Sequence, residues 1–225
     1  MTIKMNLRRF LGVGVFAGAA PFAALAVLMP ARAEPAPVPL LPTALVSPAT
    51  PELVSVFGDS ITHSVAPDNH VTAVLEDGLQ MSWNTKPGVT TDHFQNGFDE
   101  AGVNQPDVVL IATGTNDSVA PIGAVHAASI DNALDALAEN PCVVWVNVRS
   151  EIWWTHPVAW NHLLEEKAAT AGNVRVADWD GYSTGHPEWI SYDAVHLSDE
   201  GQVAYAKWLV DQVVLGCPEI VDTPQ

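Results

Sequence analysis

The chain has 225 residues and a formal net charge of −17, from 26 acidic and only 9 basic residues. A surface this acidic repels the phosphates of nucleic acids and anionic lipid headgroups, so we expect no nucleic-acid partner. The length suits one domain with a hydrophobic core of its own, and we expect a monomer.

The first 33 residues have the pattern of an export signal. Three basic residues precede an apolar run over 10–29, and Ala-Arg-Ala at 31–33 forms a cleavage site. We therefore expect a secreted or extracytoplasmic chain of about 192 residues, without stable membrane insertion after cleavage. Its net charge becomes −21, because the signal holds four basic residues and no acidic one. The alternative is an uncleaved anchor, since such an apolar run can just span a bilayer.

A proline-rich stretch follows the signal. Residues 34–51 hold six prolines without apolar periodicity, which is typical of an extended linker. We accordingly predict one domain over residues 52–218 and a short C-terminal tail at 219–225.

Within the domain, short apolar runs alternate with longer helical patterns. Nearly continuous apolar segments predict buried parallel strands at 53–57, 108–112, 143–148 and 174–177, with a weaker one at 81–84. Helices are predicted at 122–139, 158–171 and 198–215. This alternation predicts an α/β fold, in which helices cover both faces of a parallel sheet and ligands bind beyond the carboxyl ends of its strands.

Ser60 follows the first predicted strand, in Gly58-Asp59-Ser60. A serine hydroxyl becomes a nucleophile at neutral pH only when a base takes its proton. Asp193-Ala194-Val195-His196 supplies that base, because an aspartate three residues earlier on a turn can orient the imidazole toward a serine. Taken alone, the serine motif is at least as typical of a loop start or a helix cap, and the Asp-x-x-His motif is more typical of a local cap or turn.

Two further segments carry groups that can stabilise an oxyanion. Asn116, in Gly114-Thr115-Asn116-Asp117, follows a predicted strand and can donate from its side-chain amide. Gly88 can present a backbone N–H in the same way. Both segments also fit ordinary turns, since Pro87-Gly88 and Asn116-Asp117 are turn-forming pairs.

These four blocks, in this order, resemble those of the SGNH hydrolases, the GDSL-like esterase superfamily, over residues 53–215. The resemblance implies a flavodoxin-like three-layer α/β/α sandwich with a five-stranded parallel sheet. It implies Ser60 as nucleophile, His196 as base and Asp193 as its partner. It also implies an oxyanion hole from the Ser60 and Gly88 N–H groups and the Asn116 side chain. Ala194 departs from the pattern, because many relatives carry glycine there.

The function implied is that of an exported serine esterase or deacylase that needs no cofactor. It would act on an ester, such as an O-acetyl or short acyl group on a carbohydrate or lipid. Two alternatives stay open: an acyltransferase acting on cell-envelope glycans, and a non-catalytic module that binds the envelope.

Other residues compete for these roles. Gly181-Tyr182-Ser183-Thr184-Gly185 fits the Gly-x-Ser-x-Gly elbow of another hydrolase fold, but the Pro187 that follows opposes the helix that such an elbow requires. The histidines other than His196 form no His-x-His or His-Glu-x-x-His pattern, so we expect no metal site.

Aromatic and basic residues near the carboxyl ends of the predicted strands are candidates for substrate binding. Trp153, Trp154, Trp160 and Trp189 could stack on a sugar ring or line an acyl pocket, or could simply pack against the sheet. Arg149 could bind an anionic group or pair with Glu151.

Cys142 and Cys217 are the only cysteines, and an even pair in an exported chain predicts a disulfide. Cys142 opens a predicted strand, and Cys217 follows a helix that is antiparallel to it. Both cysteines are therefore expected at the amino ends of the strands, at the edge of the sheet opposite the proposed site. Two buried free thiols are the alternative.

Overall fold

The computed structural model describes residues 53–66, 79–151 and 156–217. The predicted signal at 1–33, the linker at 34–51 and the tail at 219–225 lie outside the described residues and stay predictions. Within the described ranges, no helix combines the length and the apolar character needed to cross a membrane.

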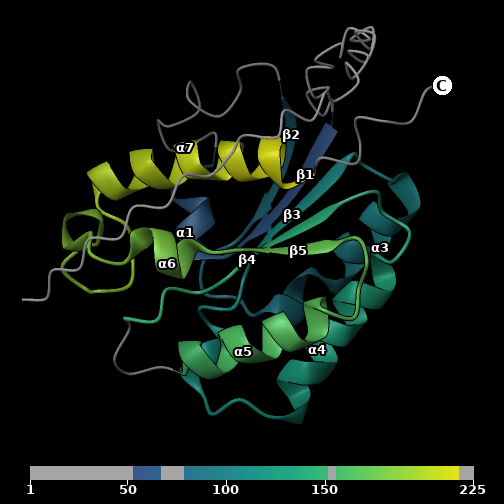
Figure 1. The fold of residues 1–225 in the computed structure, drawn as a ribbon, viewed down its shortest axis with the longest axis horizontal. Coiled ribbons are helices and arrows are strands. Elements are labelled where there is room, and N and C mark those ends of the chain that lie inside the picture. The colour runs from purple at the N-terminus through teal and green to yellow at the C-terminus, as the bar shows by residue number, and fades with distance from the viewer. Residues whose placement is uncertain (1–52, 67–78, 152–155, 218–225) are drawn as a thin grey trace, which may run out of the picture. The chain divides into compact units, whose positions relative to one another are not determined.

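Five parallel strands form one sheet, as predicted (Figure 1). In chain order they are β1 (Leu53–Gly58), β2 (Gln80–Thr85), β3 (Val108–Ala112), β4 (Val143–Val146) and β5 (Val174–Ala177). The order across the sheet is β2-β1-β3-β4-β5, which is the flavodoxin-like arrangement. Every residue of β3 and β4 is buried, because helices cover both of their faces.

Helices cover the two faces of the sheet and complete the three-layer α/β/α sandwich. Figure 1 shows α1 (Ser60–His63) and α7 (Asp199–Gly216) on one side. The other side carries α3 (Gln95–Asn104), α4 (Ala124–Ala136) and α5 (Pro157–Ala168). Alternate strand residues point to the two sides, so that Leu110 packs under α7 while Ile111 packs under α3 and α4.

Shorter elements surround the carboxyl ends of the strands. They are α6 (Trp179–Ser183) and the 3₁₀ turns η2 (Thr91–Phe94), η3 (Asp117–Val119) and η4 (Pro187–Trp189). The predicted strand 143–148 is two residues too long. Beyond Val146, the Val148 N–H donates to the side chain of Asn161 at 2.9 Å instead of to a neighbouring strand, so the chain leaves the sheet.

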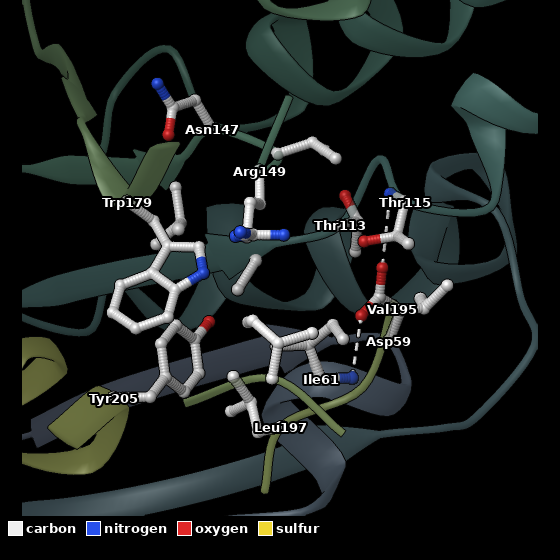
Figure 2. A pocket seen from close by; sticks show the side chains of 14 residues that line it. Asp59, Ile61, Thr113, Thr115, Asn147, Arg149, Trp179, Val195, Leu197 and Tyr205 are labelled. Carbon is white, nitrogen blue, oxygen red and sulfur yellow. Dashed lines mark hydrogen bonds between the residues drawn. The ribbon is translucent and has the colours of Figure 1, made fainter. Parts of the chain in front are cut away.

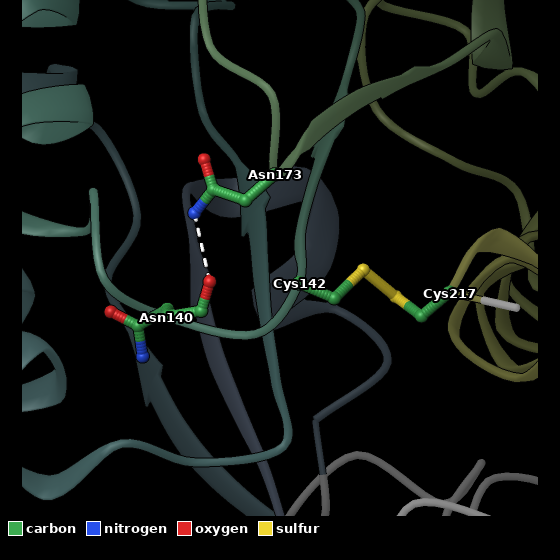
Figure 3. The surroundings of a disulfide bond; sticks show 4 residues. All are labelled: Asn140, Cys142, Asn173 and Cys217. Carbon is green, nitrogen blue, oxygen red and sulfur yellow. Dashed lines mark hydrogen bonds between the residues drawn. A yellow bond between two sulfur atoms is a disulfide. The ribbon is translucent and has the colours of Figure 1, made fainter. Parts of the chain in front are cut away.

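The predicted disulfide between Cys142 and Cys217 is present (Figure 3). Cys142 directly precedes β4 and Cys217 follows α7, and their Cα atoms are 5.9 Å apart. Both cysteines are buried. The bond therefore joins the last helix to the amino ends of the strands, opposite the rim at which Ser60 begins α1.

Removing this disulfide should lower the free energy of unfolding. Cross-linking cysteines 75 residues apart restricts the unfolded chain and stabilises the fold by about 4 kcal/mol in the chain-entropy model. We expect the Cys142→Ala/Cys217→Ala double variant to lose roughly this amount in urea unfolding at equilibrium. The wild type measured with reductant is the control, and equal unfolding midpoints for the double variant and the oxidised wild type would contradict the expectation.

Candidate active site

The predicted site residues lie where the order of the strands reverses. In the order β2-β1-β3-β4-β5 the reversal falls between β1 and β3, and ligands of such sheets bind in the crevice outside the strand ends at that point. Ser60 is two residues beyond β1, and Asn116 is four residues beyond β3. The topology thus brings together two loops that are more than fifty residues apart in sequence.

Ser60, His196 and Asp193 form one chain of hydrogen bonds. The Ser60 Oγ lies 3.0 Å from Nε2 of His196, and Nδ1 of the same ring lies 2.6 Å from an Asp193 carboxylate oxygen. With Nδ1 protonated toward Asp193, Nε2 is free to accept the Ser60 hydroxyl proton. The predicted pairing of these three side chains is therefore met in the geometry of the site.

A tight turn at residues 191–196 explains why an aspartate and a histidine three residues apart can meet. The Ala194 N–H donates to the Ser191 carbonyl at 2.9 Å, and the Ser191 N–H donates to the His196 carbonyl at 2.8 Å. Ala194 has φ of +60°, in the left-handed region that glycine adopts most easily. Glycine would therefore fit this position with less backbone strain than alanine does.

The turn also fixes the Asp193 carboxylate. One of its oxygens accepts from the Val195 N–H at 3.0 Å and the His196 N–H at 2.9 Å, and the other faces the imidazole. Partial burial alone would raise the pKa of Asp193, but the hydrogen bonds from the His196 ring and the two N–H groups hold this pKa at about 2. Asp193 therefore stays ionised beside His196 throughout the neutral range.

Asp59 holds the turn that carries Ser60 (Figure 2). Its carboxylate accepts from the Ile61 N–H at 3.0 Å, as the N-cap of α1, and from the Thr115 N–H at 3.3 Å. The residue is almost wholly buried, and desolvation raises the pKa of Asp59 to about 6 although both hydrogen bonds oppose the shift. Asp59 thus joins the loop after β1 to the loop after β3.

The raised pKa of Asp59 predicts how stability depends on pH. Between about pH 4 and pH 6 the folded protein keeps this proton while the unfolded chain releases it, so the free energy of unfolding falls as pH rises through this window. We expect the wild type to lose on the order of 3 kcal/mol relative to Asp59→Asn across the window. Urea unfolding of both proteins at several pH values measures this difference. The expectation would be contradicted if the free energy of unfolding of the wild type stayed constant or rose, relative to that of Asp59→Asn, between about pH 4 and pH 6.

The loop after β2 lies beside Asn116. The Asn116 side-chain amide donates to the Val89 carbonyl at 2.9 Å, and the Lys86 N–H donates to the Gly58 carbonyl at 2.9 Å. Gly88 lies between these two anchors, is exposed and has φ of +74°, a conformation that favours glycine. The structure therefore gathers the loops that carry Ser60, Gly88 and Asn116.

The glycine of the third block, Gly114, has a packing role. Gly114 has φ of +125°, and a Cβ added to it would overlap the indole of Trp160. Trp160 is fully buried in α5. Of the two alternatives left open for Trp160, the structure supports packing, because the buried indole lies against Gly114 in the loop after β3.

Ser183 does not occupy a nucleophile elbow. It ends α6, is fully buried, and its hydroxyl donates to the Asp180 carbonyl at 3.4 Å. A helix precedes it, whereas the elbow requires a strand there. The structure therefore supports Ser60 over Ser183.

The predicted substrate-binding residues differ in how the structure places them. Trp153 and Trp154 lie outside the described residues. Trp189 is partly exposed, but the ring of His186 stacks on it at a centroid distance of 3.8 Å and an interplanar angle of 5°. One face of Trp189 is thus already covered, which restricts the stacking that a sugar ring could make.

Arg149 is buried and pairs with Glu151. Arg149 lines a cavity of about 30 Å³. Figure 2 shows its side chain between Trp179 on one side and Thr113 and Thr115 on the other. The cavity lining includes the neighbours of Ser60 and His196 in sequence, but not Ser60 or His196 themselves. It lies behind the site, and a role for Arg149 in binding substrate stays a prediction.

Sequence reasoning missed four buried residues that connect these loops. Asp59 and Asp117 belong to the quoted blocks, but the sequence assigns neither of them a role in joining loops, and it gives no signal for the threonines at 91 and 113. In the described part of the chain, no group of three or more His, Cys, Asp or Glu side chains is arranged to hold a metal ion.

Solved structures of other proteins share this architecture. The C-terminal catalytic domain of peptidoglycan O-acetyltransferase A from Streptococcus pneumoniae is 21% identical, with a TM-score of 0.56 over 75% of this chain and 93% of that one. A carbohydrate esterase family 3 protein from Talaromyces cellulolyticus is 19% identical, with a TM-score of 0.56 over 77% of this chain and 100% of that one. At these identities the likeness shows the fold, which is that of the SGNH hydrolases.

One curated relative matches a short part of the sequence more closely. The O-acetyltransferase OatA of Staphylococcus aureus (strain NCTC 8325 / PS 47) is 40% identical over 50 residues. That stretch covers 22% of this chain and only 8% of the relative. The family model of the GDSL-like lipases and acylhydrolases matches residues 56–204, which is most of the predicted domain. The chain therefore belongs to the GDSL-like lipase/acylhydrolase family.

Proposed function

We propose that this protein is an exported serine esterase that hydrolyses an ester through an acyl-enzyme on Ser60. The observation that carries the proposal is the hydrogen-bonded chain from Ser60 through His196 to Asp193, with distances of 3.0 and 2.6 Å. Membership of a family of lipases and acylhydrolases supports the same class of reaction.

The reaction uses His196 first as a base and then as an acid. Nε2 of His196 takes the Ser60 hydroxyl proton while Oγ attacks the ester carbonyl, and the ionised Asp193 stabilises the imidazolium that forms. The imidazolium gives its proton to the leaving alcohol, which departs and leaves the acyl group on Oγ. A water molecule, deprotonated by His196, then attacks the acyl carbonyl on Oγ. His196 returns the proton to the Ser60 Oγ, and the free acid leaves. Every step is completed by side chains and water, so the proposal includes no cofactor.

The oxyanion of each tetrahedral intermediate needs hydrogen-bond donors. We assign this role to the N–H groups of Ser60 and Gly88 and to the Asn116 side chain. The Asn116 amide carries two N–H donors, and only one is needed for its bond to the Val89 carbonyl at 2.9 Å. The second N–H is therefore available to the oxyanion.

The proposed substrate is a short acyl ester, such as an acetyl ester, on a carbohydrate. The similar structures include a carbohydrate esterase and the catalytic domain of a peptidoglycan O-acetyltransferase, and both names point to acyl groups on glycans. The Cys142–Cys217 disulfide agrees with a location of the protein outside the cytoplasm, because disulfides persist in oxidising compartments.

Labelling with a fluorophosphonate, followed by peptide mapping, tests the nucleophile. The probe reacts with an activated serine, so we expect the adduct on the peptide that contains Ser60. An adduct on Ser183 would contradict the assignment. An absence of any adduct, together with retained glycan binding, would favour the non-catalytic envelope-binding module.

Acyl transfer is the second candidate function, because the 50-residue match to the O-acetyltransferase OatA favours it. The same acyl-enzyme can be resolved by a sugar hydroxyl instead of water. Incubating the protein with an acetyl ester donor and a soluble peptidoglycan or chitin oligosaccharide distinguishes the two. An esterase releases free acetate in excess, whereas a transferase yields acetylated oligosaccharide in excess.

A further inference from the structure

Two of the loops at the site are joined by a buried polar cluster that the proposed reaction does not use. One loop, at residues 86–91, follows β2 and carries Gly88, and the other, at residues 113–117, follows β3 and carries Asn116. β2 and β3 are not neighbours, because β1 lies between them in the sheet. Backbone pairing between strands therefore does not set the spacing of these two loops.

Asp117 makes the connection through Thr91. One of its carboxylate oxygens accepts from the Thr91 N–H at 3.0 Å and from the Thr91 hydroxyl at 3.1 Å, and the other lies 3.3 Å from the same N–H. The Thr91 hydroxyl in turn lies 2.8 Å from that of Thr113. Since Thr91 donates to Asp117, Thr113 must donate to Thr91. One carboxylate thus accepts from both the N–H and the hydroxyl of a residue on the neighbouring loop.

The cluster is shielded from water. Thr91 is fully buried, and Thr113 and Asp117 are 2% and 3% exposed. Burial raises the pKa of the Asp117 carboxyl, and the hydrogen bonds from Thr91 work against that shift. Burying the Asp117 carboxylate costs free energy unless it accepts its hydrogen bonds from Thr91. The cluster therefore favours the one spacing of the two loops at which these bonds form.

This spacing bears directly on Asn116, the residue next to Asp117 in the chain. The Asn116 amide reaches across to Val89, which is two residues from Thr91 on the facing loop. Both the Asn116–Val89 bond and the Asp117–Thr91 bonds therefore require the same placement of one loop against the other. If the Asp117–Thr91 bonds are lost, the anchor that orients the Asn116 amide is free to shift.

We propose that Asp117 is a positioning residue, which through Thr91 holds the Gly88 and Asn116 loops at the spacing that the oxyanion requires. The inference rests on the proposed esterase function and extends it to a residue that does not touch the substrate. A donor displaced by about 1 Å can cost on the order of 10²-fold in rate, so the effect of Asp117 should appear in kcat.

A double-mutant cycle with Asn116→Ala separates positioning from general stability. In the wild-type background, we expect Asp117→Asn to lower kcat for p-nitrophenyl acetate by roughly 10- to 100-fold with little change in KM. In the Asn116→Ala background, the donor that Asp117 orients is gone, and the further loss should shrink to about threefold or less. Thr91→Val removes only a hydroxyl and should give a smaller loss with the same dependence on Asn116.

Asn140→Ala is the matched control. Asn140 is also buried, but its side chain donates to the Ala101 carbonyl near the disulfide, at the opposite end of the sheet. It should lower the unfolding midpoint and leave kcat unchanged. Equal losses from Asp117→Asn in both backgrounds, or wild-type kcat in folded Asp117→Asn and Thr91→Val, would overturn the positioning role.

The Ser60→Ala variant separates this failure from failure of the proposed function. If Ser60→Ala keeps the wild-type rate, the acyl-enzyme mechanism is wrong and the role of Asp117 falls with it. If Ser60→Ala is inactive while the Asp117 and Thr91 variants keep wild-type kcat, only the positioning role is wrong. Should Asp117→Asn fail to fold, the cycle of Thr91→Val with Asn116→Ala decides in the same way.

Discussion

Replacement of Ser60 by alanine is expected to lower kcat/KM for a short p-nitrophenyl ester by roughly 10⁴- to 10⁶-fold. The alanine has no oxygen to attack the ester carbonyl, so His196 at 3.0 Å from the lost Oγ has no proton to take. Steady-state hydrolysis, corrected for the reaction without enzyme, measures the loss.

Ser183→Ala is the control for this substitution. Ser183 is the serine of the competing Gly-x-Ser-x-Gly motif, and it is fully buried at the end of α6. Its variant should keep kcat/KM near the wild-type value. An active Ser60→Ala beside an inactive, folded Ser183→Ala would reverse the assignment of the nucleophile.

Replacement of Asp193 by asparagine should have the second largest effect, a loss of roughly 10³- to 10⁴-fold in kcat. The Val195 and His196 N–H groups, at 3.0 and 2.9 Å, would select the amide oxygen of the asparagine. Its NH₂ group would then face Nδ1 of His196, which must accept instead of donate. The ring proton moves to Nε2, and the imidazole can no longer take the proton of Ser60.

Asp199→Asn tests whether the effect of Asp193→Asn is specific. It makes the same change in charge three residues after His196, in the first turn of α7 and beyond the turn at residues 191–196. This variant should keep wild-type kcat. Equal losses in the two variants would show that the overall charge of the segment matters and that the pairing of Asp193 with His196 does not.

The buried centre of the sheet was the most predictable part of the fold. β3 and β4 are continuous apolar runs, because both of their faces are covered by helices. Runs of this kind indicate buried parallel strands directly from the sequence. α3 was missed because Gly97 and Gly102 interrupt it and only Phe98 and Ala101 are buried, which leaves little periodic signal. Both glycines are there for close packing, which depends on residues far away in the sequence.

The site was predictable where function depends on order and spacing along the chain. Ser60, Asp193 and His196 follow from short motifs, and the fold explains how Ser60 meets His196 across 136 residues. The buried carboxylates were not predictable in the same way. Asp59 and Asp117 belong to turn-like sequences, and only the packing of three loops shows which groups surround them. The Asp59 carboxylate accepts from the N–H groups of Ile61 and Thr115, and the Asp117 carboxylate accepts from Thr91.

The central claim is that an acyl group passes through Ser60. A brief reaction with p-nitrophenyl acetate, quenched in acid and followed by peptide mass analysis, tests it most directly. We predict that the peptide containing Ser60 gains the mass of one acetyl group, that the adduct disappears on further incubation before quenching, and that Ser60→Ala shows no adduct. Steady hydrolysis that persists in Ser60→Ala, or a transient adduct confined to another residue, would contradict the account.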